Sequence, residues 1–190
     1  YAYCINGSIA YATSLPMGED EEYLSFVPMA WGAEQLMGLI PWLIYGVTMN
    51  FAESAETVME NIREIGPAVM LLGTRLWESL LSTVQMKIND SSFSKKLVYK
   101  LTLPIGYKVA DYRLKGKREP PLFWKVLYQI ANWVCFRPIR DQLGLEHTKF
   151  AMGGGTLMGP DTFRFFLAIG THIGVTYGLA ETTPPCSYII

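Results

Sequence analysis

The first third of the chain alternates short apolar runs with helical periodicity. Residues 21–29 (EEYLSFVPM) alternate polar and apolar side chains and end in an apolar stretch, which predicts a strand stopped by Pro28. A helix is expected over 33–45, and residues 47–51 are expected to form a short buried strand. The hydrophobic period therefore changes twice between residues 21 and 51, as it does where strands and helices alternate.

The next segment repeats this order. Residues 54–65 predict a helix with Ser54 as N-cap, and Gly66 followed by Pro67 is expected to stop it. Residues 68–72 (AVMLL) predict a second apolar strand. The apolar positions that recur at helical spacing in the expected helix are Val58, Ile62 and Ile65.

A longer helix is expected from Thr74 onward. Its expected buried face consists of Leu76, Leu80, Val84 and Ile88, which recur every four residues. Strand, helix, strand and helix in this order predict an α/β fold, with a sheet flanked by helices.

The middle of the chain is more polar. Residues 90–118 predict a helix followed by a surface excursion, and their basic side chains are expected to form a solvated face. An anionic membrane surface is the functional alternative for the end of this run, through Arg113, Lys115, Lys117 and Arg118. Residues 123–143 return to helical periodicity, and we expect the aromatic side chains at 123, 124, 128, 133 and 136 to pack rather than to bind a cofactor.

The last third has the layout of a ligand site. Residues 148–152 lead into three glycines and Thr156, and a short helix from Pro160 through Ile169 follows, with Gly170 as its expected end. Residues 173–177 then predict a strand that runs into a polar loop. Strand, glycine turn, helix, strand and loop place polar groups at the carboxyl ends of strands, where α/β proteins bind ligands.

Composition and charge exclude some classes of protein. Half of the 190 residues are apolar, which is incompatible with a disordered chain. Sixteen Lys and Arg against 17 Asp and Glu give a net charge of -1, so we expect no nucleic-acid partner. The longest apolar run, residues 36–49, contains Pro41 and is shorter than the roughly twenty residues that span a bilayer.

The ends of the chain and its cysteines suggest a cytoplasmic protein. No signal or transit peptide is recognisable in the first fifteen residues, and the start at Tyr1 is typical of an interior cut. Cys4, Cys135 and Cys186 are widely spaced and odd in number, so we expect small buried hydrophobes in a reducing compartment.

The sequence lacks the motifs of several common binding and catalytic sites. The glycines at 153 to 155 let a backbone approach a ligand, but Met158 stands where a dinucleotide fingerprint needs its last glycine. No Walker-type loop, HExxH, CxxC or GxSxG motif occurs. What remains is Tyr177 and Gly178 followed by Glu181, which offer a stacking ring, a flexible turn and a ligand for a hard divalent cation.

In combination, these segments resemble the adenylate-forming superfamily, and within it the long-chain acyl-CoA synthetases. The Y-G-x-T-E motif of that family is similar to YGLAE at 177–181, and its glycine turn and Phe-Phe helix are similar to GGGTLMGPDTFRFFLAIG at 153–170. Other similar segments are VPMAWGAEQ at 27–35, NFAESAETVMENIREIGPAV at 50–69, TRLWE at 74–78 and RPIRDQLGL at 137–145. The resemblance covers nearly the whole chain.

This resemblance implies an ATP-dependent ligase. A carboxylate would attack the α-phosphate of ATP to form acyl-AMP and pyrophosphate, and coenzyme A would then displace AMP to give a thioester. It also implies that residues 1–190 are the interior of the large N-terminal AMP-binding domain. The phosphate loop would lie upstream and the mobile C-terminal domain downstream, so the chain alone is expected to be inactive.

The resemblance also assigns roles to residues. Tyr177 would stack on adenine, Glu181 would bind Mg2+ as the catalytic carboxylate, and Trp31 would lie near the acyl chain. The remaining nucleotide-binding positions would be Gly153, Gly154, Gly155, Thr156, Gly178, Ala180 and Thr182.

One motif position departs from the family. Ala180 replaces a threonine whose hydroxyl contacts phosphate, so a charge-assisted hydrogen bond of about 1.5 to 3 kcal/mol is missing unless Thr182 or Thr183 provides it. The alternative function is therefore a non-catalytic relative that keeps the fold and acts as a lipid-binding or scaffold protein.

Overall fold

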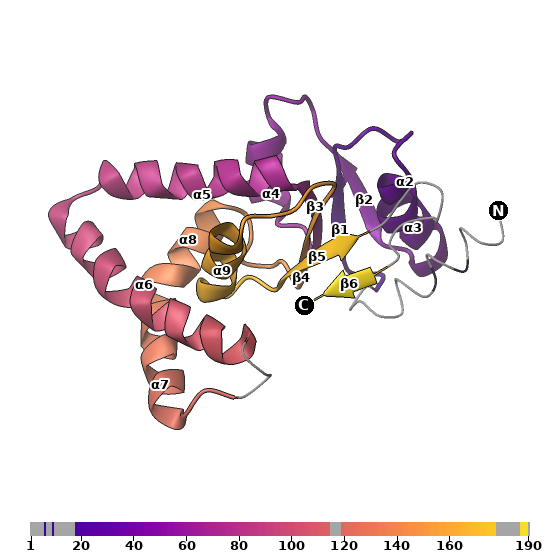
Figure 1. Ribbon diagram of the computed structural model, residues 1–190. Helices are drawn as coiled ribbons and strands as arrows, with labels where there is room; N and C mark the ends of the chain where they lie inside the picture. The colour runs from indigo at the N-terminus through magenta and orange to yellow at the C-terminus, as the bar shows by residue number, and fades with distance from the viewer. Residues whose placement is uncertain (1–5, 7–8, 10–17, 115–118, 178–186, 190) are drawn as a thin grey trace.

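A computed structural model describes residues 6, 9, 18–114, 119–177 and 187–189 (Figure 1). Its described part contains one six-stranded sheet in the order β2-β1-β3-β4-β5-β6, in which only β6 runs antiparallel to its neighbour. The strands are β1 (Glu22–Ser25), β2 (Thr48–Phe51), β3 (Val69–Gly73), β4 (Phe150–Gly154), β5 (Ile173–Tyr177) and β6 (Ser187–Ile189).

Helices connect the parallel strands. They are α2 (Gly32–Glu34), α3 (Ile40–Tyr45), α4 (Val58–Ile65), α5 (Thr74–Asn89), α6 (Phe93–Leu114), α7 (Leu122–Ala131), α8 (Arg137–Gln142) and α9 (Pro160–Ala168). Two π-helical turns, η1 (Gln35–Leu39) and η2 (Asn132–Phe136), join α2 to α3 and α7 to α8. The α/β fold class is thereby confirmed.

The sheet is buried on both faces. Along β3, Met70 and Leu72 pack into the larger hydrophobic cluster, whereas Val69 and Leu71 pack into the smaller one. Alternate side chains of a strand point to opposite faces, so the two clusters lie on opposite sides of the sheet. This burial explains why β3 is an uninterrupted apolar run, as central parallel strands are.

Trp77 of α5 is the largest side chain of the main core and is fully buried. Its indole Nε1 donates a hydrogen bond to the carbonyl of Met152 on β4 at 3.1 Å. Its ring meets Phe166 of α9 edge to face, with 4.7 Å between ring centroids. One side chain thus connects α5, β4 and α9.

Helix α6 crosses α9 closely at Gly106. A Cβ at this position would lie 2.7 Å from the backbone oxygen of Ala168 and 2.9 Å from the Phe136 ring. Arg164 of α9 also donates two hydrogen bonds to the Asp111 carboxylate of α6, at 2.8 and 2.7 Å. The long excursion is therefore fixed to the core by a steric fit and an ion pair.

Most expected elements are present, with different boundaries. The strand expected over 21–29 is the shorter β1, which ends three residues before Pro28. The excursion expected within 90–118 is one helix, α6, over most of that length. Cys135 is buried, as expected of a small hydrophobe, and burial raises the pKa of its thiol; Cys4 and Cys186 lie outside the described residues.

Four local expectations are wrong. The strand expected to be buried over 47–51 is β2, an edge strand whose residues are exposed or half-buried. Ser54 does not cap α4, because its hydroxyl closes a turn with Thr57 and the helix begins only at Val58. Leu76 is 37% exposed, because the inward position of that turn is taken by Trp77. Phe123 and Trp133 do not pack inside, although Phe136 of the same segment is fully buried.

None of the helices in the described part combines the length and the apolarity that a membrane span requires.

The close crossing of α6 and α9 leads to a stability prediction for Gly106→Ala. In a solvent-exposed helix this change would stabilise the protein by up to about 1 kcal/mol. Here we expect a lower free energy of unfolding, by roughly 1 to 3 kcal/mol, because the added methyl group meets a rigid backbone carbonyl. Urea unfolding of the purified protein measures this. As a control, Gly18→Ala adds a methyl group that meets no atom of the described residues within 4 Å, and equal unfolding midpoints for the two variants would contradict the close crossing.

Candidate functional site

The carboxyl ends of β3, β4 and β5 lie next to one another. The register pairs Gly73 with Gly154 and Gly153 with Val175, so the glycine turn after β4 has β3 on one side and β5 on the other. Thr176 of β5 reaches back across this edge, where its hydroxyl donates to the carbonyl of Gly153 at 3.3 Å. This is the edge of a parallel sheet at which α/β proteins bind ligands.

The glycines of this edge are required for two different reasons. At Gly154 a Cβ would lie 2.8 Å from the Thr176 hydroxyl, and at Gly153 it would collide with the Met158 side chain. Gly155 instead has φ +91°, a left-handed conformation that other residues avoid. The first two glycines permit close packing, whereas the third permits the turn.

Two of the glycines border open space. Within the part of the chain that the structure describes, a Cβ built on Gly73 or on Gly155 meets no atom within 4 Å. Among the described residues, no side chain therefore stands against the backbone at these two positions.

Helix α5 adds positive electrostatic potential to the same edge. It begins at Thr74, directly after β3, and its first turn contains no acidic residue. The Thr74 hydroxyl donates to the carbonyl of Thr156 at 2.8 Å, which ties the start of the helix to the glycine turn. The unpaired N–H groups and the dipole of a helix N-terminus favour an anionic ligand.

The structure brings only part of the expected site together. Gly153 and Gly154 end β4 and are buried, Gly155 and Thr156 follow them exposed to solvent, and Tyr177 ends β5 with 62% of its surface exposed. Gly178, Ala180, Glu181 and Thr182 lie outside the described residues.

Trp31 stands apart from the glycine turn. It caps α2, after the carboxyl end of β1, and it is 40% exposed. In the sheet order, β3 lies between β1 and β4. Trp31 therefore follows a strand of the same sheet, but β3 lies between that strand and the one that leads into the glycine turn.

Sequence reasoning missed Thr74 and Thr176. Both place hydroxyl groups within hydrogen-bond distance of the backbone of the glycine turn. The available signal was their position, since one directly follows an apolar strand and the other directly precedes Tyr177. Thr74 and Thr156 are 82 positions apart in the sequence, and Thr176 and Gly153 are 23 positions apart. Local sequence patterns do not reveal contacts over such distances.

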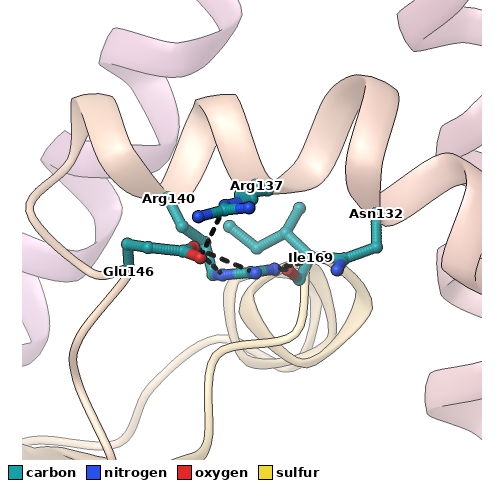
Figure 2. Close-up of polar contacts among 5 residues, drawn as sticks. All are labelled: Asn132, Arg137, Arg140, Glu146 and Ile169. Carbon is teal, nitrogen blue, oxygen red and sulfur yellow. Dashed lines mark hydrogen bonds and ion pairs between the residues drawn. The ribbon is translucent and has the colours of Figure 1, made fainter.

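At the opposite end of β5, Arg140 connects α8 to the end of α9 (Figure 2). Its Nη1 donates to the side-chain oxygen of Asn132 at 2.8 Å and to the carbonyl of Ile169, and its Nε donates to Glu146 at 3.2 Å. Arg137 pairs with the same carboxylate at 3.0 Å. The guanidinium thus neutralises the carbonyl end of α9 and fixes the turn that leads into β5.

His172 lies beside this cluster rather than at the carboxyl edge. Burial lowers the pKa of its imidazole, and the positive charges of Arg113 and Arg140 lower it further. The neutral form is therefore favoured near neutral pH. Among the described residues, no group of three His, Cys, Asp or Glu side chains is arranged to hold a metal ion.

The Arg140 cluster leads to a prediction for Arg140→Lys. A lysine keeps the charge but cannot reach Asn132, Glu146 and the Ile169 carbonyl together, so we expect the free energy of unfolding to fall by about 1.5 to 3 kcal/mol. Urea unfolding measures the loss. Arg75→Lys on the exposed side of α5 is the matched control, expected to stay within about 0.5 kcal/mol of the parent. Equal losses in both variants would show that the Arg140 geometry contributes nothing.

Known proteins are similar to this chain in sequence and in fold. The family model described as AMP-binding enzyme matches residues 2–190. The chain is 28% identical over 171 residues to the long-chain-fatty-acid–CoA ligase ACSBG2 of Rattus norvegicus, with 88% of this chain and 25% of that protein covered. It is 27% identical over 168 residues to ACSBG2 of Homo sapiens, with 87% and 25% covered. The chain therefore spans about a quarter of the length of these relatives.

A solved structure has the same fold. It is the A-PCP didomain of carboxylic acid reductase from Segniliparus rugosus in complex with AMP, with a TM-score of 0.53 and 15% identity over 93% of this chain and 21% of that one. Together with the ligase relatives, this likeness confirms the resemblance to adenylate-forming long-chain acyl-CoA synthetases. The family model extends over nearly the full sequence, and the chain belongs to the AMP-binding enzyme family.

Proposed function

We propose that the full-length protein containing this chain activates a long-chain fatty acid with ATP and transfers it to coenzyme A. The fatty carboxylate attacks the α-phosphate and forms acyl-AMP, and pyrophosphate leaves with the electron pair of the broken bond. The thiol of coenzyme A then attacks the acyl carbonyl, forms the thioester and releases AMP. The protein is proposed to act in the cytoplasm.

The observation that carries this proposal is the open backbone at the carboxyl edge. Gly73 and Gly155 leave room where side chains would stand, and the start of α5 turns its positive end toward the same edge. A flat adenine ring can lie against backbone that no side chain covers, and the phosphate of acyl-AMP is stabilised by a positive potential. The described residues of this edge offer both. These two features support the proposal that a nucleotide binds at this edge.

The resemblance to the adenylate-forming family supports each proposed role. Tyr177 is exposed at the end of β5 and would stack on adenine, while the backbone of residues 153 to 156 would face the adenine and the acyl carbonyl. Gly178, Ala180 and Thr182 would line the nucleotide beyond Tyr177. Exposed Trp31 would contact the acyl chain.

Glu181 would hold Mg2+. A carboxylate suits this hard cation, which supplies charge neutralisation at the phosphates when bound. The proposed role of the protein is to position the carboxylate of Glu181, which follows Tyr177 by four residues in the sequence.

A non-catalytic function is the second candidate. It is favoured by Ala180, since a methyl group cannot donate the hydrogen bond that the family threonine makes. Such a protein would keep the carboxyl edge and bind a lipid or another protein there without turnover.

The basic end of α6 is proposed as a peripheral membrane contact. Arg113 is exposed in the last turn of α6, and Lys115, Lys117 and Arg118, which follow it in sequence, lie outside the described residues. Clustered basic side chains attract anionic lipids.

The magnesium role is tested by Glu181→Gln in the full-length protein. This change keeps the size of the side chain and removes its charge, so we expect pyrophosphate release in the presence of ATP and a long-chain fatty acid to fall roughly 100-fold or more. Glu78→Gln on the exposed side of α5 is the control and should release pyrophosphate at the parent rate. A fully active Glu181→Gln variant would remove the magnesium assignment.

Ala180→Thr separates the two candidate functions. For a ligase, the restored hydrogen bond of about 1.5 to 3 kcal/mol should raise acyl-AMP formation by roughly 10- to 100-fold. Single-turnover formation of acyl-AMP measures this. Should neither protein form acyl-AMP, and should ATP not raise the Tm of either, the non-catalytic function would replace the ligase.

A further inference from the structure

The outer side of α7 and η2 carries an unusual concentration of exposed apolar side chains. Their exposed fractions range from 48% for Val134 to 76% for Leu122. A solvated helix normally presents polar residues on its outer face. We call this surface the α7 face, and it consists of Leu122, Phe123, Val126, Ile130, Trp133 and Val134.

Helix geometry places these six residues on one side. Steps of three, four and seven positions separate Val126, Ile130 and Trp133 from one another, which is the spacing of neighbours on a helix surface. The opposite side of the same segment is held in the main core by Ala131, Cys135 and Phe136. The α7 face is therefore presented outward by a helix that is anchored along its other side.

The helix that carries this face and the helix packed against it hold mostly positive charge. No acidic residue occurs between Glu119 and Asp141, so α7 and η2 carry none. Helix α6 packs against α7 and contributes exposed Lys95, Lys96, Lys100 and Lys108. Its single carboxylate, Asp111, is bound by Arg164.

The charge of these helices differs from that of the whole chain. Together, α6, α7 and η2 hold six basic residues and one acidic residue, whereas the chain has a net charge of -1. Within the described residues, none of the four lysines of α6 forms an ion pair. An apolar face on a pair of packed helices with an excess of positive charge complements a surface that is both apolar and negatively charged.

We propose that the α7 face docks onto an anionic lipid bilayer and inserts its apolar side chains at the headgroup boundary. The fifteen residues of α7 and η2 measure about 22 Å, so they lie along the interface rather than across the bilayer. Phe123 and Trp133 are side-chain types that favour this boundary. This surface differs from the run of basic residues at 113–118, because its contribution is apolar.

The charge also favours lipid over a second copy of the chain. In a symmetric dimer built on this face, the lysine-rich helices of both protomers would lie near each other without acidic partners. Anionic headgroups neutralise these lysines instead. If the proposed ligase function holds, docking also places the enzyme where fatty acids are dissolved, but the docking itself does not depend on catalysis.

The first test measures binding of the full-length protein to vesicles, without ATP or fatty acid. We expect co-sedimentation with phosphatidylcholine vesicles that contain phosphatidylserine, and weaker binding to phosphatidylcholine alone. The double variant Ile130→Ser/Trp133→Ser should lower the partition coefficient at least tenfold. Phe51→Ser/Met86→Ser, which removes two exposed apolar side chains elsewhere, should bind as the parent does. Equal binding by both double variants would overturn the proposal.

The second test shows whether the α7 face is free. Val126→Cys in the full-length protein is labelled with an environment-sensitive fluorophore, which should be accessible to iodide in solution and shift to shorter wavelength on addition of anionic vesicles. A label already shielded without vesicles would overturn the proposal, because another part of the protein or a second copy would then cover the face. Gel filtration of the Ile130→Ser/Trp133→Ser variant distinguishes these two occupants, since a change in mass points to the second copy. Neither readout requires ligase activity, so the proposed function can fail independently.

Discussion

The hydrogen bond from the Trp77 indole to the Met152 carbonyl links the core to the candidate site. Met152 directly precedes the glycine turn, so the contact that fills the core also fixes the position of Gly153 and of the residues that follow. Phe166 holds the same ring from α9, the helix that begins beyond the turn. The open backbone at Gly155 is therefore bounded on both sides by rigidly packed elements, and its accessibility comes from the glycine rather than from loose packing.

The period of the apolar residues was enough to predict the order of strands and helices. Helix boundaries were less predictable, because they depend on competition between local hydrogen bonds: Ser54 bonds within a turn with Thr57, so it cannot cap α4. Periodicity predicts Leu76 on the buried face of α5, but Trp77 takes that position in the structure. An apolar period does not distinguish two neighbouring positions, and only the contacts with α9 and β4 select Trp77. The exposure of Trp133 was beyond prediction for a similar reason, because aromatic residues in a helical pattern normally indicate a core.

The candidate site was predictable where one short segment carries the chemistry, as with the glycine turn and Tyr177. The hydroxyls of Thr74 and Thr176 and the positive end of α5 were not, because they belong to the site only through the parallel pairing of β3, β4 and β5. Arg140 was unpredictable in the same way. Its partners come from η2, from the residue directly after α9 and from the segment before β4, and no sequence motif indicates that one guanidinium serves all three.

The pairing of β3 with β4 also has a consequence for the order of folding. These strands are neighbours in the sheet, yet α5, α6, α7 and α8 separate them along the chain, and Trp77 reaches its acceptor across 75 positions. Closing so long a loop before its contacts form is slow, and local helices form much faster. During synthesis, the edge of β3 that pairs with β4 therefore stays open until β4 has emerged, so the interval in which the chain is most prone to aggregation lies within the translation of its helical segment.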